Sequence, residues 1–298
     1  MTTSTTQTHA PVHARRPLLR DVPANRPASR ALRYNRLAAR LIRAGRPERA
    51  LKLLRAARAQ IVAQHGEHSS QYANVLNNLG VLYQRLEDPD QALWCYQQAL
   101  DVDRHTCGEN HPQFATHLNN LAALHQELGW LQEAIEFLEH AVRIDRHTVG
   151  ANHRQLGTHL NNLADVYRAL GEPEQALEYM KEAVAVGRRT LGVEHPRYAA
   201  RLNNLAVLHA RTGQTQEAVG LLETARDILR QTRPAVHPDI ATVLANLARF
   251  LMEADRVADA RTPAEEALAQ FTELFGADHP HTRIARRIRN RYLAHTGN

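Results

Sequence analysis

Cysteine is scarce in this sequence, which argues against a protein stabilised by disulfides or by a structural zinc site. The 298 residues include only two cysteines, Cys95 and Cys107. Two thiols supply neither a disulfide framework nor the four ligands of a structural zinc site. Low cysteine usage of this kind is typical of a reducing compartment. We therefore expect a cytoplasmic protein with no disulfides, no resident metal and no cofactor.

Long apolar runs and aromatic residues are also scarce. No apolar stretch approaches the roughly 20 residues of a membrane-spanning helix, so we expect no transmembrane segment. Residues 1–28 are polar and basic and lack the apolar centre of a secretory signal, so we expect a disordered basic tail there. Aromatic residues make up 5% of the chain, whereas Ala, Leu, Arg, Glu and Gln dominate. That composition favours helix.

Lysine is nearly absent from a chain that is rich in arginine. Of 37 basic residues only Lys52 and Lys181 are lysines, which indicates a GC-rich and hence bacterial coding sequence. The net charge of +6 is divided into +9 over residues 1–50, −8 over 51–280 and +5 over 281–298. An acidic body between basic ends differs from the even basic stripe of a dedicated nucleic-acid binder. Clustered arginines can nevertheless contact phosphates.

One sequence string recurs with a fixed period of 42 residues. Leu-Asn-Asn-Leu begins at Leu76, Leu118, Leu160 and Leu202, and weaker copies begin at Leu244 and Tyr34. Other residue types keep the same period: His111, His153, His195, His237 and His279; Gly129, Gly171 and Gly213; Ala92, Ala134, Ala176, Ala218 and Ala260. Six copies in register indicate a repeat architecture.

Each copy is predicted to form two helices. Leu118, Leu121 and Ala122 have helical spacing, and Gly129 stands where a left-handed C-cap belongs. Prolines occupy the first turn of the second helix at Pro47, Pro89 and Pro173. One helix pair cannot bury its apolar face alone, so successive pairs must stack into a solenoid.

The predicted fold is all-α. Six helix-turn-helix repeats span residues 29–280, with the first and last degenerate. Residues 281–298 fall out of the repeat phase, and we expect them to form a C-terminal capping helix and tail. Ile284, Ile288 and Tyr292 share one face of that helix, which we expect to pack on the last repeat.

The repeat resembles the tetratricopeptide repeat in its 42-residue, kinesin-light-chain-like form. Within residues 71–112 the resemblance rests on Leu79, Gly80 and Tyr83, on Ala92, Tyr96 and Ala99, and on the linker 108–112. It implies a right-handed superhelix that binds peptides or proteins on the concave face formed by the first helices. The motor-associated parts of kinesin light chains are missing, so the resemblance does not imply transport.

The helical wheel predicts which residues line the groove. Counting Leu79 as position 7 of its helix, positions 4, 7, 8 and 11 form the core face, and positions 2, 5, 6, 9, 12 and 13 form the opposite arc. The candidate groove residues on this arc are Asn77, Asn78, Asn119, Asn120, Asn161, Asn162, Asn203, Asn204, Asn246, Arg85, Arg168, Arg211 and Arg249. Specificity would come from the variable positions of this arc: Val81, Ala123, Asp165, Val207 and Arg249 at position 9, with Arg85, Glu127 and Arg211 at position 13.

The asparagines at positions 5 and 6 need a reason, because asparagine is a poor helix former. One interpretation is an amide ladder that grips the backbone of an extended peptide, since each amide offers an acceptor and two donors. The other is that one asparagine per repeat bonds to the neighbouring helix and locks the stacking. The sequence leaves both open.

The 18 histidines do not indicate a metal site or a catalytic site. The five repeat-phased histidines lie at least ~8–10 Å apart, too far for zinc, so we expect them to cap or pack helices. His125 and His209 occupy a core position. His117 and His159 flank the groove arc, and we expect them to face solvent or, alternatively, to contact a ligand. No catalytic constellation is evident, so the chain is not expected to be an enzyme.

The function predicted from the sequence is that of an interaction scaffold or adaptor. Its partner would be a peptide or protein segment bound in the concave, asparagine-lined groove. One alternative is a nucleic-acid-associated regulator that uses the arginine-rich termini. A peptide-signal receptor is another. The identity of the partner and the oligomeric state are left open.

Overall fold

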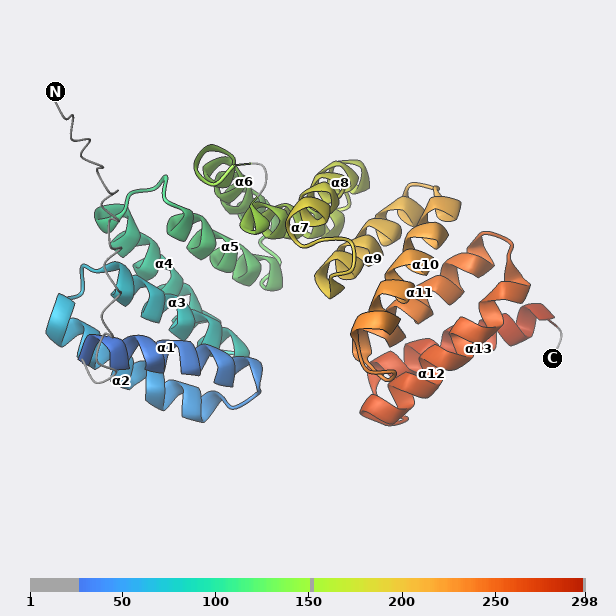
Figure 1. Cartoon of the computed structure of the whole chain (residues 1–298), viewed down its shortest axis with the longest axis horizontal. Coiled ribbons are helices and arrows are strands. Elements are labelled where there is room, and N and C mark those ends of the chain that lie inside the picture. Colours follow the sequence, from blue (N-terminus) through green and yellow to red (C-terminus); the bar gives the residue numbers. More distant parts are fainter. Residues whose placement is uncertain (1–26, 151–152, 297–298) are drawn as a thin grey trace, which may run out of the picture.

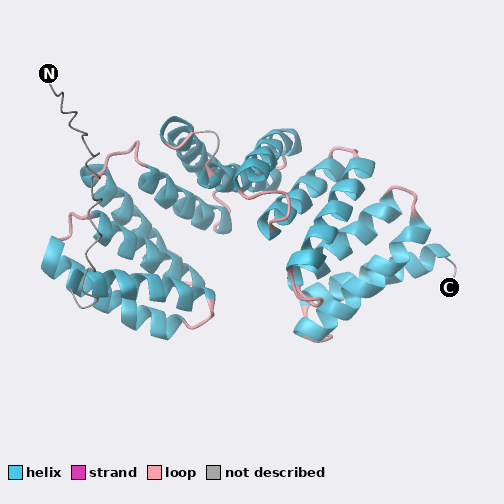
Figure 2. Cartoon of the chain, viewed as in Figure 1, coloured by secondary structure: helices cyan, strands magenta, loops and turns pink. Residues whose placement is uncertain are grey.

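The computed structural model describes residues 27–150 and 153–296, and within these ranges it contains thirteen α-helices and no strand. The helices form six pairs and a final single helix, and the two helices of each pair run antiparallel (Figures 1 and 2). The first helices of the pairs are α1 (Pro27–Arg43), α3 (Ser70–Arg85), α5 (Pro112–Glu127), α7 (Arg154–Leu170), α9 (Pro196–Arg211) and α11 (Pro238–Glu253). The second helices are α2 (Pro47–His65), α4 (Pro89–Thr106), α6 (Leu131–Thr148), α8 (Pro173–Thr190), α10 (Thr215–Thr232) and α12 (Arg261–Phe275).

Two features interrupt the regular alternation at the C-terminal end. A short 3₁₀ helix, η1 (Val257–Ala260), precedes α12, and the single helix α13 (Pro280–Thr296) ends the described chain. The all-α fold of six repeats and a capping helix, predicted from the 42-residue period, is therefore confirmed. The predicted basic tail falls mainly on residues 1–26, which lie outside the described residues.

The repeat-phased histidines are N-caps. In each case Nδ1 accepts a hydrogen bond from the backbone N–H two residues further on, at 3.0–3.3 Å. A cap of this kind satisfies one of the backbone donors left over at the start of a helix. Proline follows the histidine in four of the five cases and fits the first helical turn. The predicted capping role of these histidines is confirmed.

The first helices end in a left-handed residue. Gly129, Gly171 and Gly213 have φ of 81°, 92° and 80°, as predicted for C-caps. Two repeats lack glycine in this slot and use Glu87 and Asp255 instead, with φ of 58° and 61°. With Gly45 in the first repeat, where φ is 66°, the same left-handed turn therefore follows the first helix of all six repeats.

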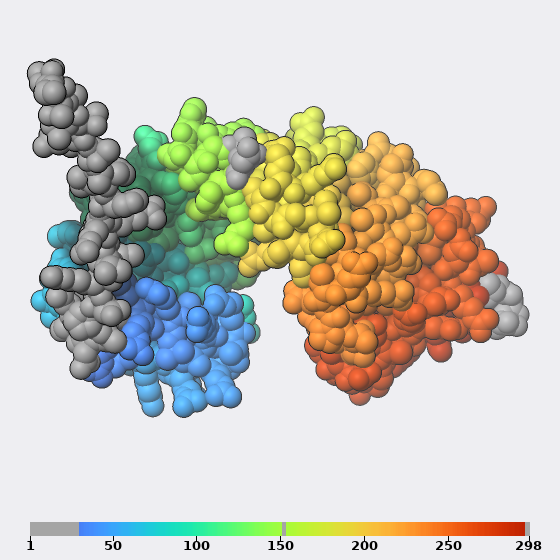
Figure 3. Space-filling model, viewed as in Figure 1, coloured from blue at the N-terminus to red at the C-terminus, as the bar shows by residue number. Residues whose placement is uncertain are grey.

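The stacked pairs curve into an arch. First helices contact the first helix of the next repeat (α1 with α3, α3 with α5, α5 with α7, α9 with α11), whereas no pair of second helices in the described chain makes a contact of similar extent. The more closely spaced layer of a bent stack lies on its inner side, so the first helices line the concave face. The space-filling view shows a broad hollow between the N-terminal and C-terminal ends (Figure 3).

Gly80 illustrates how one repeat departs from the others and compensates. A Cβ atom at Gly80 would lie 2.6 Å from Cε1 of the fully buried Tyr96 ring. The four following repeats have alanine at the Gly80 position (Ala122, Ala164, Ala206 and Ala248) and no aromatic residue at the Tyr96 position (Leu138, Met180, Leu222 and Ala264). Glycine and tyrosine thus form a matched pair in repeat two.

We expect Gly80→Ala to lower the free energy of unfolding by about 1–3 kcal/mol because the added methyl group overpacks the core. Helix propensity alone predicts that the free energy of unfolding rises by about 1 kcal/mol. The sign of the measured change therefore shows whether overpacking or helix propensity dominates. The matched control is Gly80→Ala combined with Tyr96→Leu, which copies the next repeat and should recover most of the loss. Guanidinium unfolding followed by circular dichroism measures both; stabilisation by the single change would refute the close packing.

The capping helix α13 packs through a face slightly different from the predicted one. Ala285 and Tyr292 are buried and Ile288 is half-buried, but Ile284 is 51% exposed. The rotation of the helix is set by buried Thr282, whose hydroxyl donates to the carbonyls of Phe271 at 3.1 Å and Gly276 at 2.8 Å. The expectation that Ile284 packs on the last repeat was therefore wrong.

Within the described ranges no helix is long and apolar enough to cross a membrane.

Candidate functional site

The asparagines of the repeat form a hydrogen-bonded ladder between the first helices. In each repeat Nδ2 of the position-6 asparagine donates to Oδ1 of the position-5 asparagine in the repeat before it. The five bonds are Asn78 to Asn35 (2.8 Å), Asn120 to Asn77 (2.8 Å), Asn162 to Asn119 (2.8 Å), Asn204 to Asn161 (3.2 Å) and Asn246 to Asn203 (2.9 Å). Both asparagines of repeats two to five thus take part in stacking, while the first repeat takes part through Asn35 and the sixth through Asn246.

Longer hydrogen bonds within the repeats join these five bonds, which are the rungs of the ladder. Nδ2 of Asn119, Asn161 and Asn203 lies 3.4 Å from Oδ1 of the asparagine that follows it. The amides therefore form one relay along α5, α7, α9 and α11. Apart from Asn35 and Asn77, which are buried, the ladder asparagines are only half-buried.

The ladder still has hydrogen-bonding capacity to spare. An asparagine side chain has two N–H donors and an oxygen with two lone pairs. Asn119 and Asn203 each use one N–H and accept one bond, so their second N–H has no partner in the described part of the chain. Asn161 differs, because it also donates to Asp165 at 3.1 Å. The ladder asparagines can thus hold neighbouring repeats together and still have N–H groups for a ligand.

The predicted groove arginines do not form a single cluster. Arg85 and Arg211 are exposed and Arg168 is half-buried, with its Nε 3.5 Å from Asp165. Arg211 donates to the backbone carbonyl of Arg168. Arg249 is half-buried over the ring of Phe250, at 4.4 Å from the centroid.

Asp165 is the acidic group in the middle of the ladder. Burial raises the pKa of its carboxyl above the usual range, and neighbouring Arg168 opposes that shift. The middle of the arc therefore combines amides, one carboxyl group and two arginines, and it can accept a polar backbone more readily than a uniformly charged chain.

The two histidines expected beside the groove arc are buried between repeats instead. His117 is 1% exposed, with Nδ1 2.7 Å from Oδ2 of Asp103, and His159 is 2% exposed, with Nδ1 2.9 Å from Oδ2 of Asp145. Both aspartates are fully buried. The expectation of a solvent-facing side chain was wrong because the preceding repeat covers position 3 of each first helix. His125 and His209 are buried, as predicted.

The Asp–His pair occupies this inter-repeat position at two interfaces, and other pairs occupy it elsewhere. Two interfaces are apolar at this position, where Ile61 meets Val75 and Leu229 meets Val243. The third polar interface pairs Gly187 with Arg201. Arg201 is 6% exposed and donates to the carbonyl of Ala183 at 3.2 Å. A Cβ at Gly157 or Gly187 would lie 2.8 or 2.5 Å from its Nη1, so both glycines make room for the guanidinium. The sequence did contain a signal for the two Asp–His pairs: Asp103 and His117 recur 42 residues later as Asp145 and His159.

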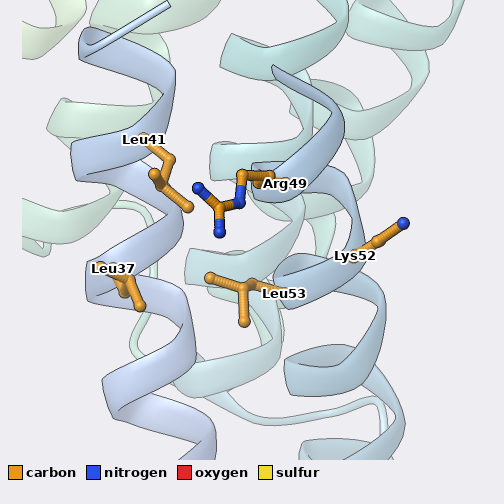
Figure 4. A pocket seen from close by; sticks show the side chains of 5 residues that line it. All are labelled: Leu37, Leu41, Arg49, Lys52 and Leu53. Atoms are coloured by element: carbon orange, nitrogen blue, oxygen red, sulfur yellow. The ribbon is translucent and has the colours of Figure 1, made fainter. Parts of the chain in front are cut away.

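An apolar cavity lies away from the ladder, at the N-terminal end of the arch. It has a volume of about 500 Å³ and is lined by Leu37, Leu41, Leu53, Arg49 and Lys52. Arg49 reaches from α2 toward the leucines of α1, whereas Lys52 points away from them (Figure 4). Interior repeats have a preceding helix pair at this place, and among the described residues no helix pair precedes α1. No group of three or more metal-ligating side chains occurs among residues 27–150 and 153–296.

Family models and solved structures agree on the fold. The family model described as tetratricopeptide repeat matches residues 29–105, 73–147, 113–188 and 155–231, and a second model of the same description matches residues 240–281. Together these matches cover more than two thirds of the chain. No curated protein sequence matches it.

Among solved structures, the chain is similar to kinesin-light-chain-like proteins. A putative kinesin light chain from Podosopora anserina, with nearly identical TPR-like repeats, has 28% identity over 70% of this chain and 98% of that one, with a TM-score of 0.61. BtubC (BKLC) from P. vanneervenii has 22% identity over 84% and 94%, with a TM-score of 0.66. A Rap protein complexed with Competence and Sporulation Factor has 14% identity over 90% and 75%, with a TM-score of 0.62.

Proposed function

The chain belongs to the tetratricopeptide repeat family, and from that premise we propose that it is an adaptor that holds an extended protein segment along the asparagine ladder. Repeats of this family are in general scaffolds for protein–protein interaction. The observation that carries the finer proposal is the ladder itself. Its amides join the first helices on the concave face and keep N–H groups available for a ligand.

A backbone in extended conformation suits this surface. Its carbonyl groups alternate in direction, so a row of fixed N–H donors can bind one side of it without reading its sequence. The ladder amides are fixed by their bonds across each repeat interface, which lowers the entropy cost of ordering them on binding. Specificity would come from position 9 and from the arginines of the arc.

The charges of the arc support a polar, mixed-charge segment more than an acidic one. Arg168 is partly neutralised by Asp165, and Arg249 lies over an aromatic ring of its own helix. A clamp for a string of carboxylates would instead gather its cations in one cluster, which the groove arginines do not form. The cytoplasm, predicted from low cysteine usage, is the compartment we propose for this adaptor.

Blocking the groove with a bulky residue tests the proposal. Ala123 is half-buried at position 9 of α5, and Ala185 is exposed on second helix α8. Peptides selected on the wild-type chain from a displayed random library should lose at least about tenfold in affinity for Ala123→Trp, or about 1.4 kcal/mol. Ala185→Trp is the matched control and should bind as the wild type does. Equal affinities for both variants would exclude the first-helix arc as the binding surface.

A further inference from the structure

The C-terminal helix α13 has features that repeat stacking does not require. It contains five arginines and no acidic residue. Arg283, Arg287 and Arg291 are all exposed and follow one another at intervals of four residues, about 6 Å along the helix. They form one stripe on the side of the helix opposite buried Ala285 and Tyr292. None of the three has an ion-pair partner among the described residues.

Four stacked rings lie at the N-terminal end of this stripe. Phe275 and His279 are 4.6 Å apart between centroids, His279 and His281 are 5.2 Å apart, and Phe271 and His281 are 5.4 Å apart. Phe271 is buried beneath the cluster, whereas Phe275 is 41% exposed and His281 is also exposed. The cluster thus presents planar ring surface to solvent beside Arg283.

Three of the four rings, Phe271, Phe275 and His281, are not part of the repeat, whereas His279 is the repeat-phased N-cap. The position of Phe275 is held by His65, Cys107, Val149, Leu191 and Arg233 in earlier repeats, and that of His281 by Gln71, Gln113, Gln155, Arg197 and Asp239. Repeat packing therefore proceeds without them. An exposed aromatic cluster beside a row of unpaired guanidinium groups is the combination that binds single-stranded nucleic acid, because bases stack on rings while arginines contact phosphates.

We infer that α13 and the ring cluster form a binding surface for single-stranded nucleic acid, separate from the groove. One or two bases stack on Phe275 and His281, and the backbone that follows lies along Arg283, Arg287 and Arg291. Two acidic residues, Glu273 and Asp278, are exposed nearby and limit the surface on the α12 side. An anionic membrane is a poorer fit, because the apolar face of α13 is buried and only Ile284 is apolar in the arginine stripe.

Fluorescence anisotropy of the full chain with a labelled 20-nucleotide oligothymidylate tests the surface. Changing Arg283, Arg287 and Arg291 together to glutamine should weaken binding at least about tenfold and make the slope of log affinity against log salt shallower by about 2. The matched control changes Arg143, Arg188 and Arg197 to glutamine, three exposed arginines without ion pairs at other sites. It removes the same charge and should weaken binding less than threefold.

A second probe separates stacking from charge. Phe275→Leu with His281→Gln should weaken binding of oligothymidylate about fivefold or more, but leave binding of an abasic oligomer of equal length unchanged. Equal losses for the two arginine triples, equal effects of the ring variant on both oligomers, or binding only to phosphatidylserine vesicles would each overturn the inference. The residues changed lie outside the groove, so failure here leaves the adaptor proposal untouched.

Discussion

Replacing His159 with valine is expected to lower the free energy of unfolding by about 3–5 kcal/mol, the largest stability effect we predict for a single residue. The histidine is 2% exposed and faces the fully buried carboxyl group of Asp145 across the interface between the third and fourth repeats. Valine would leave the buried carboxyl group of Asp145 without the imidazole that it faces. The cost is the desolvation of a buried polar group that has lost its partner, which exceeds the value of the pair itself.

The chain supplies the matched control for this experiment. At the corresponding positions Leu229 meets Val243 in an apolar interface. Combining His159→Val with Asp145→Leu copies that interface and should return the stability to within about 1 kcal/mol of the wild type or above it. Guanidinium unfolding of the two variants gives both numbers. A loss under 1 kcal/mol for the single variant would mean that water reaches Asp145, and a double variant as weak as the single would mean that the pair itself stabilises the stack.

Replacing Asn119 and Asn203 with aspartate is expected to weaken binding of a groove-selected peptide at least about tenfold while stability falls by about 1 kcal/mol or less. Aspartate keeps the oxygen that accepts from Asn162 and Asn246 in the next repeats, so the rungs of the ladder survive. It removes the N–H groups that would contact a ligand. Titration calorimetry and thermal melting measure the two effects separately.

The alanine versions of the same sites provide the comparison. Asn119→Ala with Asn203→Ala removes the acceptors as well as the donors, and each loss should cost about 1 kcal/mol. We therefore expect alanine to lower both stability and binding, and aspartate to lower binding alone. If the aspartate variant binds as tightly as the wild type, the asparagines serve only to lock the repeats together.

The sequence was sufficient to predict the repeat architecture because its signals are local. The 42-residue period, the His-Pro starts and the glycine at Gly129 and its equivalents each depend on one helix or one turn. The structure adds the hydrogen bonds that those residues make. Helix start sites such as His111 could thus be predicted residue by residue.

The contacts between repeats could not be predicted in the same way. A helical wheel places His159 beside the groove arc, but it says nothing about the preceding repeat that covers that side of the helix. Likewise, the hydrogen bond from Asn120 to Asn77 can be identified only once α3 and α5 are placed side by side in their correct register. The sequence therefore left open whether the asparagines bind a ligand or the neighbouring helix, and in the structure both asparagines bond across the interface.

The orientation of α13 was missed for a related reason. Ile284, Ile288 and Tyr292 share one face, and periodicity favoured packing through all three. The helix is instead rotated by the bonds of Thr282 to Phe271 and Gly276. The buried hydroxyl lies in the first turn of α13 itself, and a bond of this kind leaves no periodic trace in the sequence.

Site-specific photo-crosslinking tests the adaptor proposal most directly. A photoreactive phenylalanine derivative is placed in turn at Val81, Ala123 and Val207, which occupy position 9 of α3, α5 and α9, and at Ala185 as the control on second helix α8. The account predicts that one partner segment is captured from all three groove positions, that the crosslinked residues follow one another along that segment in the order of the repeats, and that Ala185 captures none of it. Crosslinks in no consistent order, or capture from Ala185 at the same yield, would contradict it.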